Sequence, residues 1–577
     1  QESLGGGAPA PTLEDMLASP HDEDMFVYYA TSQLAGVDLA TGKITPIGKP
    51  GIIESAHISP NGKDVLVTTI HKPFSYLHGY NSFPKEIEVW DMTGKLLHKV
   101  ASVPLEDKVP LNGVITGPRN VQWRVSEPAT LIWVEALDGG DLRNQAPFRD
   151  KILTVKGPFT AAPQEVFKTE ARATGIMMAP KGGMALVGDS DRKTRRVRTF
   201  QIDLDKPGQP AVTLWSRNQQ DRYKDPGTPE AKAMPNGQAA ILMDGDSIFL
   251  SGLGASPTGD HPFLDRFNLA KKQTDHLFRC DDSHYEQVVA LLDEHGDRFL
   301  TRQESPAEPP NYMLRTAGGK MTAITRFPDP QPQIRGISKE LVKYERPDGV
   351  DLQFTLYLPA DYKPGTRLPT VMWAYPYEYN DAATAGQVSG STKRFTEMTG
   401  YSELFFALEG YAVLANTAMP IIGDPDTVND HFVDQVVADA RAAVEKAVEM
   451  GVSDRSRIGV GGHSYGAFMT DTLLAHSDLF KAGIAESGAP NRTLTPFGFQ
   501  NERRTLWQAP EVYLRMSPFM YADKIKAPLL FIHGEADDNS GTFPIQSERM
   551  YEAVRGNGGI TRLVFLPFEA HGYRGKE

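Results

Sequence analysis

The chain has 577 residues, of which 40% are hydrophobic, and its formal net charge is −13. This length is too great for one hydrophobic core, so we expect two or more domains. The acidic balance argues against nucleic acid or an anionic membrane surface as the main partner, and no apolar run reaches the roughly 20 residues of a membrane-spanning helix. The single cysteine, Cys280, excludes an internal disulfide framework and a cysteine-rich zinc site.

The chain begins with Gln1–Gly7, which lacks a basic segment followed by an apolar one, so we expect any targeting peptide to be absent or already removed. A pair of short strands is then predicted at Phe26–Tyr29 and Leu34–Val37. This pair resembles the end of a repeating unit. We therefore expect the chain to begin inside a repeat domain, with earlier units lost or not included.

From there to about residue 335, one pattern recurs, in which a turn rich in proline and glycine precedes a short strand. Four copies resemble one another, with a looser fifth: Ser59–Val67, Ser126–Val134, Ala179–Val187, Met234–Leu242 and Glu294–Leu300. The period of roughly 50–70 residues is typical of a β-propeller with four short strands per blade. We assign residues 1–335 to a β-propeller that is incomplete if earlier blades are missing, and keep an irregular β-sandwich as the alternative.

The pattern changes after Pro332, and we assign residues 336–577 to a second domain. A hairpin is predicted at Lys343–Leu358, and apolar runs then alternate with segments of helix length. The runs are 370–375, 412–415, 458–460, 482–485, 529–532 and 563–566. Valines and alanines between residues 433 and 448 form one apolar helix face, which Gly451 closes. This alternation predicts a doubly wound, mostly parallel sheet with reactive groups on loops at the carboxyl ends of its strands.

One stretch of this domain, Arg457–Thr470, predicts a strand, a tight turn and a helix around Gly462-x-Ser464-x-Gly466. A serine on such a strained turn exposes its hydroxyl, and the flanking positions must lack side chains so that backbone can pack closely. The helix that follows directs its free N–H groups toward an oxygen that becomes negative. We predict that Ser464 is a nucleophile; a purely structural turn is the alternative.

Two later loops follow apolar runs and carry the groups that a serine nucleophile needs. His571 follows the last run and is the candidate base that takes the proton of Ser464. Asp537 or Asp538 supplies the carboxylate that fixes the tautomer of His571, in the chain order serine, acid, histidine. Two other histidines are expected to pack around these groups: His463 and His533.

These motifs resemble the prolyl oligopeptidase family of serine peptidases, whose members carry an α/β-hydrolase domain capped by a β-propeller. The likeness covers about the whole chain, and three stretches look like the glutamyl endopeptidase branch of plastids and bacteria: Gly461–Thr470, Asn491–Trp507 and His533–Ser540. Relatives continue into a helix after the catalytic histidine, whereas this chain stops six residues after His571. We expect that segment to be missing here, which would leave His571 near a frayed end.

The resemblance also implies roles for single residues. It places the acid on Asp537 and a substrate-contacting residue at Asn539. It places the oxyanion tyrosine at Tyr375, which would act together with the backbone N–H of Tyr465.

The segment that lines the first specificity pocket in this family contains Arg492, Arg503 and Arg504. The branch prefers glutamate before the scissile bond, and a buried carboxylate needs a cation to offset its desolvation. Arg492 and Arg504 coincide with arginines of the branch, so they are our candidates for binding that carboxylate through paired hydrogen bonds. Ordinary surface ion pairs are the alternative for each of them.

Together these features predict a serine peptidase that works through an acyl-enzyme, prefers glutamate before the scissile bond and needs neither metal nor cofactor. Its partners would be peptides or unfolded protein segments admitted by the propeller, and its oligomeric state is open. An esterase or acyl hydrolase on the same triad and a catalytically inactive propeller scaffold are the alternatives. We favour a bacterial periplasmic or secreted location, with the plastid stroma as the alternative.

Overall fold

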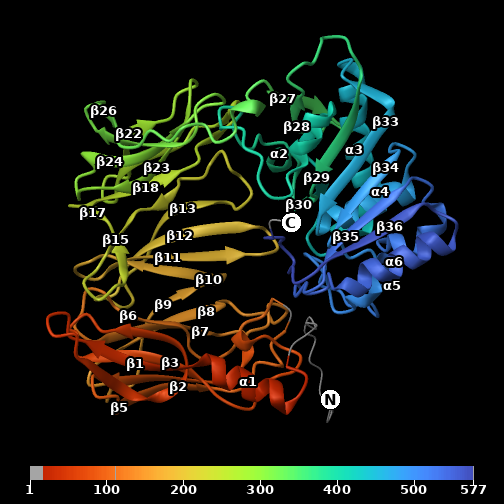
Figure 1. The fold of residues 1–577 in the computed structure, drawn as a ribbon. Helices are drawn as coiled ribbons and strands as arrows, with labels where there is room; N and C mark the ends of the chain where they lie inside the picture. The colour runs from red at the N-terminus through yellow and green to blue at the C-terminus, as the bar shows by residue number, and fades with distance from the viewer. Residues whose placement is uncertain (1–16, 111, 576–577) are drawn as a thin grey trace. The chain divides into compact units, whose positions relative to one another are not determined.

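The computed structural model describes residues 17–110 and 112–575 (Figure 1), and contacts within the chain divide it into two compact units. The first comprises residues 17–110, 112–218, 228–250 and 266–275, and the second comprises 219–227, 251–265 and 276–575. The expectation about targeting at Gln1–Gly7 lies outside the described residues. The boundary predicted between residues 335 and 336 stays a prediction. Within the described ranges, none of the helices combines the length and the apolar character that crossing a bilayer requires.

The segment predicted as a strand at Phe26–Tyr29 is helical, within α1 (Pro20–Ala30). The Ser19 side chain accepts a hydrogen bond from the N–H of Asp22 at 3.4 Å, and Pro20 occupies the first turn. Both are start signals of a helix. The strand prediction was wrong here because these N-terminal signals outweigh the β propensity of a short aromatic run. The second predicted strand lies in β1 (Thr31–Val37).

Between residues 31 and 323, five sheets of four or five strands follow one another along the chain. The first contains β1, β2 (Ile44–Ile58), β3 (Asp64–Ile70), β4 (Lys85–Asp91) and β5 (Leu96–Val103). The second contains β6 (Arg119–Trp123), β7 (Thr130–Ala136), β8 (Asp150–Lys156) and β9 (Gln164–Thr169), and the third contains β10 (Arg172–Met178), β11 (Met184–Asp191), β12 (Arg196–Asp203) and β13 (Val212–Asn218). The fourth contains β14 (Thr228–Pro229), β17 (Met243–Asp244), β18 (Ser247–Gly252), β21 (Phe263–Asn268) and β22 (Gln273–Arg279), and the fifth contains β23 (Tyr285–Leu291), β24 (Arg298–Glu304), β25 (Asn311–Thr316) and β26 (Met321–Ala323).

Four of the five repeated turns join neighbouring strands of these sheets, whereas the turn at Met234 joins β15 (Ala231–Ala233) to β16 (Ala239–Ile241) in a separate two-stranded sheet. The turn at Ser59 joins β2 to β3, and those at Ser126, Ala179 and Glu294 join the first strand to the second in their own sheets. Gly62, in the first of these turns, has a φ of 70°, in the left-handed region that glycine adopts without steric cost. Strand pairs in these four sheets are antiparallel. Consecutive small antiparallel sheets with a recurring turn are consistent with a β-propeller.

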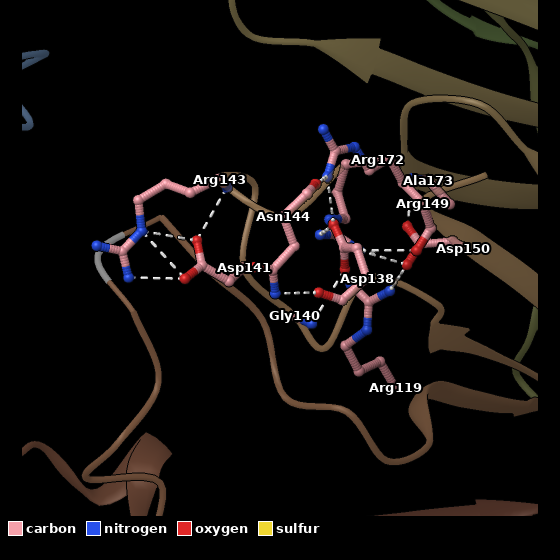
Figure 2. Close-up of polar contacts among 10 residues, drawn as sticks. All are labelled: Arg119, Asp138, Gly140, Asp141, Arg143, Asn144, Arg149, Asp150, Arg172 and Ala173. Atoms are coloured by element: carbon pink, nitrogen blue, oxygen red, sulfur yellow. Dashed lines mark hydrogen bonds and ion pairs between the residues drawn. The ribbon is translucent and has the colours of Figure 1, made fainter. Parts of the chain in front are cut away.

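A buried ionic cluster joins the second sheet to the third (Figure 2). Asp150 begins β8, and its side chain is fully buried. One carboxylate oxygen accepts hydrogen bonds from Arg119 of β6 and from Arg172 of β10 at 2.6 Å. The other oxygen accepts the backbone N–H of Ala173 at 2.7 Å. The Asp150 carboxylate is therefore shared between two adjacent sheets.

Asp138 extends the same cluster. Its buried carboxylate lies 2.7 Å from Arg172 and 3.0 Å from Arg149. Burial alone would raise the pKa of Asp138, but these two guanidinium groups lower it below its ordinary value. The charge of Asp138 therefore stabilises the fold above the unfolded pKa of about 4, and this stabilisation is lost as the pH falls through the lower folded pKa.

Replacement of Asp150 tests how much this cluster contributes. We expect Asp150→Asn to lower the free energy of local opening of β8 and β10 by about 3–5 kcal/mol, because it leaves two mostly buried guanidinium groups, those of Arg119 and Arg172, without their shared carboxylate. Hydrogen exchange of the backbone amides in these strands measures this free energy. The control is Arg143→Met, which removes an ion pair to Asp141 whose arginine is 77% exposed, and which should cost less than about 1 kcal/mol. Equal effects of the two changes would contradict the assignment.

The second unit contains an eight-stranded sheet. Its strands in spatial order are β27 (Ser338–Glu345), β28 (Asp351–Leu358), β31 (Ala412–Thr417), β29 (Leu368–Ala374), β33 (Ser453–His463), β34 (Ala482–Glu486), β35 (Leu529–Gly534) and β36 (Thr561–Leu566). The β27–β28 and β28–β31 pairs are antiparallel, and the remaining pairs are parallel. The predicted mostly parallel sheet is confirmed.

Both faces of this sheet are covered, as the apolar runs require. In β31, Leu414 packs in the core cluster that includes α3 (Phe432–Glu449) and α4 (Tyr465–His476). Its neighbour Val413 packs on the opposite side with the 3₁₀-helix Glu403–Glu409. A third helix, α6 (Pro544–Gly556), packs beside β35 and β36. Shorter elements complete the fold: α2 (Ala382–Ala385), α5 (Pro510–Arg515), β15 (Ala231–Ala233), β16 (Ala239–Ile241), β19 (Ala255–Ser256), β20 (Gly259–Asp260), β30 (Tyr377–Tyr379) and β32 (Pro420–Ile422).

Candidate active site

Ser464 lies on the sharp turn between β33 and α4. Its φ of 59° and ψ of −116° are unusual for a residue with a side chain, so the surrounding structure must hold the turn in place. The Ser464 N–H donates to the carbonyl of Glu486 at 2.7 Å, which ties the turn to the end of the neighbouring strand β34. The hydroxyl is thereby presented at the carboxyl end of the parallel strands.

The two glycines beside Ser464 are required by close backbone contacts. A Cβ atom on Gly466 would lie 2.4 Å from the carbonyl oxygen of Ala374, at the end of β29. A Cβ atom on Gly462 would lie 2.6 Å from the backbone of Gly466 and 2.8 Å from the same Ala374 oxygen. Real Cβ contacts are not this short, so neither position accepts a side chain without movement of the turn or of β29.

Three side chains form a continuous chain of hydrogen bonds. His571 Nε2 lies 2.9 Å from Ser464 Oγ, and His571 Nδ1 lies 2.9 Å from Asp537 Oδ2. The imidazole thus bridges the serine hydroxyl and the carboxylate, each at normal hydrogen-bond length. In this geometry, Nε2 can take a proton from the hydroxyl while Nδ1–H donates to the carboxylate.

The Asp537 carboxylate is almost fully buried, at 2% exposure, and is held on several sides. Its oxygens accept the backbone N–H of Asn539 at 3.0 Å and the hydroxyl of Thr542 at 3.2 Å. His533, itself fully buried, lies 3.2 Å away. Burial alone would raise the pKa of Asp537, but hydrogen bonds from His533 and His571 lower it well below its ordinary value.

The structure distinguishes the two neighbouring aspartates and places the remaining predicted residues. Asp538 is exposed, whereas Asp537 is the carboxylate that meets His571. Asn539 is also exposed, and its side-chain amide donates to Thr542 at 3.0 Å. His463 contributes a ring that lies 4.8 Å from the ring of His571, measured between centroids.

Thr542 was not anticipated from the sequence. Its hydroxyl lies 3.2 Å from both Asp537 Oδ1 and His571 Nδ1, so it touches both members of this pair. It also accepts the amide of Asn539, which completes a small polar network around the carboxylate. No motif marks this threonine, because its position depends on the fold of the loop that follows β35.

Tyr375 directly follows β29, and its ring lies 5.9 Å from that of Tyr465. Burial and the nearby Tyr377 raise the pKa of the Tyr375 phenol, while hydrogen bonds with Gln500 and Ser464 oppose this rise. The phenol therefore keeps its proton at neutral pH and can donate it in a hydrogen bond close to the serine. Tyr465 begins α4, where backbone N–H groups have no acceptor within the helix.

Arg492 is buried beside this tyrosine pair, at 4% exposure. Its guanidinium carbon lies 3.9 Å from the ring centroid of Phe468, 4.6 Å from that of Phe499 and 5.4 Å from that of Tyr465. Within the part of the chain that the structure describes, no carboxylate lies within 4.0 Å of its nitrogens. Burial lowers the pKa of Arg492 to about 10, so the group stays cationic at neutral pH.

Arg504 differs sharply from Arg492, although both were predicted to bind the same carboxylate. Its guanidinium lies 2.7 Å from Asp430 and 2.7 Å from the buried Glu502. Hydrogen bonds to Glu502 raise the pKa of Arg504 above its ordinary value. The positive charge of Arg504 is therefore already neutralised by two acidic side chains.

A cavity of about 1080 Å³ adjoins these groups, and its lining includes Tyr375 and His463 but not Arg492. All of its lining residues belong to the second unit. Among the described residues, no group of three histidine, cysteine, aspartate or glutamate side chains is arranged to hold a metal ion.

Two protein-family models match parts of the chain that contain the serine turn. Residues 426–577, which contain Ser464, Asp537 and His571, match the model of the prolyl oligopeptidase family. These residues form a prolyl oligopeptidase family domain. A second model, the X-Pro dipeptidyl-peptidase (S15 family), matches residues 348–501, which include the serine turn of the prolyl oligopeptidase domain.

The similarity to known proteins extends over 98% of the chain. The chain is 41% identical over 589 residues to "Probable glutamyl endopeptidase, chloroplastic" of Oryza sativa subsp. japonica, and 42% identical over 593 residues to the protein of the same name in Arabidopsis thaliana. It covers 63% and 61% of these two proteins, so it spans about three fifths of their length. The solved acylaminoacyl peptidase of Pyrococcus horikoshii shares the fold, with a TM-score of 0.61 and 16% identity over 94% of this chain and 82% of that one.

The close contact between Gly466 and β29 in the prolyl oligopeptidase domain can be tested directly. We expect Gly466→Ala to slow the labelling of Ser464 by a fluorophosphonate about 10²-fold, because the added Cβ displaces the turn from its position beside His571. The control is Gly556→Ala at the end of α6, where a Cβ would meet no atom within 4 Å, and labelling should change less than about twofold. Unchanged labelling of Gly466→Ala would show that the turn does not depend on this contact.

Proposed function

We propose that this chain is a serine peptidase that cleaves peptide bonds through an acyl-enzyme on Ser464. The observation that carries the proposal is the hydrogen-bond chain from Ser464 Oγ through His571 to Asp537, with both distances at 2.9 Å. A serine hydroxyl is a weak nucleophile unless a base takes its proton, and this arrangement supplies the base and the carboxylate that orients it.

In the first half of the proposed reaction, His571 Nε2 accepts the proton of Ser464 as Oγ attacks the scissile carbonyl. The oxygen that becomes negative is bound by the hydroxyl of Tyr375 and the backbone N–H of Tyr465. The C–N bond then breaks, and His571 gives its proton to the leaving amine. In the second half, water attacks the ester in the same way, with His571 as base and Ser464 Oγ as leaving group.

Asp537 is the proposed partner of the imidazolium that forms twice in this cycle. Because its pKa lies well below the ordinary value, it stays ionised across the neutral range and favours the positive charge on His571. Thr542 and Asn539 hold this carboxylate in place through its second oxygen. A contact of Asn539 with substrate stays a prediction.

For specificity, we propose that Arg492 binds the carboxylate of a glutamate side chain before the scissile bond. A buried guanidinium without an acidic partner is costly, and a substrate carboxylate would supply the missing charge. The charge of Arg504 does not require a substrate carboxylate, because Asp430 and Glu502 already neutralise it. The two plant relatives, each named "Probable glutamyl endopeptidase, chloroplastic", support the same preference.

The proposed partners are peptides or unfolded protein segments. Because both plant relatives are named chloroplastic, they support a plastid location, and the plastid stroma was the alternative in our prediction. The bacterial periplasmic or secreted location has no such support and stays a prediction.

The proposed triad predicts different effects for two adjacent aspartates. Asp537→Asn should lower kcat about 10⁴-fold, because the amide no longer fixes the tautomer of His571 or stabilises its charge. Asp538→Asn is the matched control and should change kcat less than about twofold, since this side chain is exposed. Both are measured as hydrolysis of a glutamyl peptide, together with fluorophosphonate labelling of Ser464.

The outcomes also separate the alternative functions. Labelling of Ser464 with turnover of esters but not of peptides would indicate an esterase. No labelling and no turnover would indicate an inactive scaffold. A larger loss in Asp538→Asn than in Asp537→Asn would contradict the assigned acid.

The proposed role of Arg492 predicts a preference for peptides with glutamate over matched peptides with glutamine. We expect Arg492→Met to lower the ratio of kcat/KM for matched glutamate and glutamine peptides by about 10–100-fold, because a charge-assisted hydrogen bond is lost only with glutamate. Arg504→Met is the control and should leave this ratio within about twofold of wild type, although it leaves the buried Glu502 without its cation. A wild-type preference for proline, or a glutamate preference that survives Arg492→Met, would refute the role of Arg492.

A further inference from the structure

The cavity beside the catalytic groups is larger than one side chain needs. Its volume of about 1080 Å³ lies at the upper end of the range for ligand pockets, and it meets the reaction centre at Tyr375 and His463. Arg492 is absent from its lining, so the cavity does not hold the side chain that we assign to Arg492. A peptide bound at Ser464 would therefore place another part of its chain in this cavity.

One wall of the cavity carries three cations around one carboxylate. Glu304, at the end of β24, is 4% exposed and accepts the backbone N–H of Phe395 at 3.1 Å. Arg302 lies 3.2 Å from this carboxylate and Arg394 lies 3.8 Å from it. Lys339, on β27, lines the same cavity. One carboxylate cannot neutralise three cations, so this wall is positively charged.

Of these three cations, Lys339 has the charge that neighbouring carboxylates neutralise least. Its Nζ donates to the backbone carbonyl of Arg394, and no carboxylate among the described residues lies within 4.0 Å of it. Burial lowers the pKa of Lys339 to about 8, with a favourable effect of Glu304 opposed by the positive charges of Arg394 and Arg335. Lys339 also lines the cavity, so a ligand there could reach its ammonium group.

The other charged groups that line the cavity do not form ion pairs with these three cations. Arg222 is paired with Asp260 at 3.3 Å. Burial raises the pKa of the Glu403 carboxyl. Among the described residues, neither Glu403 nor Glu397 lies within 4.0 Å of the nitrogens of Lys339, Arg302 or Arg394.

We propose that Lys339, Arg302 and Arg394 form a second subsite, which binds a carboxylate of the substrate at a distance from the scissile bond. The carboxylate is either an acidic side chain or the free C-terminus of the peptide, since both present the same two oxygens to this wall. The inference rests on the proposed peptidase activity and extends it, because acidic recognition would then occur at two separate places on one substrate.

Matched peptides test the subsite in the full chain. All carry glutamate before the scissile bond; one further residue, two to four positions away on either side, is glutamate or glutamine, and the C-terminus is free or amidated. We expect the distal carboxylate to raise kcat/KM about tenfold, chiefly by lowering KM. A difference between glutamate and glutamine identifies a side chain as the ligand, and a difference between free and amidated ends identifies the C-terminus.

Variants assign this preference to Lys339. Lys339→Met should bring the ratio of kcat/KM for peptides with and without the distal carboxylate close to one. Lys339→Arg should keep most of this ratio. Lys343→Met, on the same strand but outside the cavity lining, should keep the wild-type ratio. A wild-type ratio near one for both comparisons, or a ratio that survives Lys339→Met, would overturn the subsite.

Binding to the Ser464→Ala protein separates this inference from the proposed function. Fluorescence anisotropy with a labelled distal-acid peptide should show about tenfold tighter binding than with its glutamine counterpart, and Lys339→Met in the same background should remove the difference. If wild type cleaves no peptide but this Lys339-dependent difference is present, the peptidase proposal fails and the subsite stands. If peptides are cleaved but the difference is absent, the subsite alone fails.

Discussion

The close approach of Gly466 to the carbonyl of Ala374 is the contact on which the rest of the site depends. It presses the first turn of α4 against the end of β29, and Tyr375 is the next residue along that strand. The same contact therefore sets the distance between the Ser464 hydroxyl and the phenol of Tyr375. The strained backbone of Ser464 is held by this packing on one side and by its hydrogen bond to the Glu486 carbonyl on the other.

Two buried charged residues of the site, Asp537 and Arg492, have different surroundings. Asp537 is buried, but His571, His533, the Asn539 N–H and the Thr542 hydroxyl all stabilise its negative charge. Arg492 is equally buried, yet its neighbours are aromatic rings that attract a cation only weakly. A fully compensated charge suits a residue that works within the protein. An uncompensated one suits a residue whose partner arrives with the substrate, which is the basis of the proposed preference for glutamate.

Much of the fold could be predicted because it follows from local patterns. The valine and alanine stripe of α3 and the apolar runs of the eight-stranded sheet reflect short-range geometric requirements. The glycine spacing around Ser464 is a short motif that can be read from the sequence, although the contact that requires it, with Ala374, is distant along the chain. The distinction between Arg492 and Arg504 could not be predicted, because both lie in one segment and differ only in tertiary contacts. Thr542 and the burial of Asp537 relative to Asp538 likewise depend on how one loop folds over β35. The helix at Phe26–Tyr29 was missed although Ser19 and Pro20 signal its start.

The proposed preference for glutamate requires that the Arg492 guanidinium binds a substrate carboxylate. A crystal structure of the protein with a peptide aldehyde ending in glutamate, bound covalently to Ser464 Oγ, tests it most directly. We expect the glutamate carboxylate of this adduct to lie within about 3 Å of the Arg492 nitrogens. An adduct in which the carboxylate lies elsewhere, while Arg492 stays enclosed by its aromatic neighbours, would contradict it.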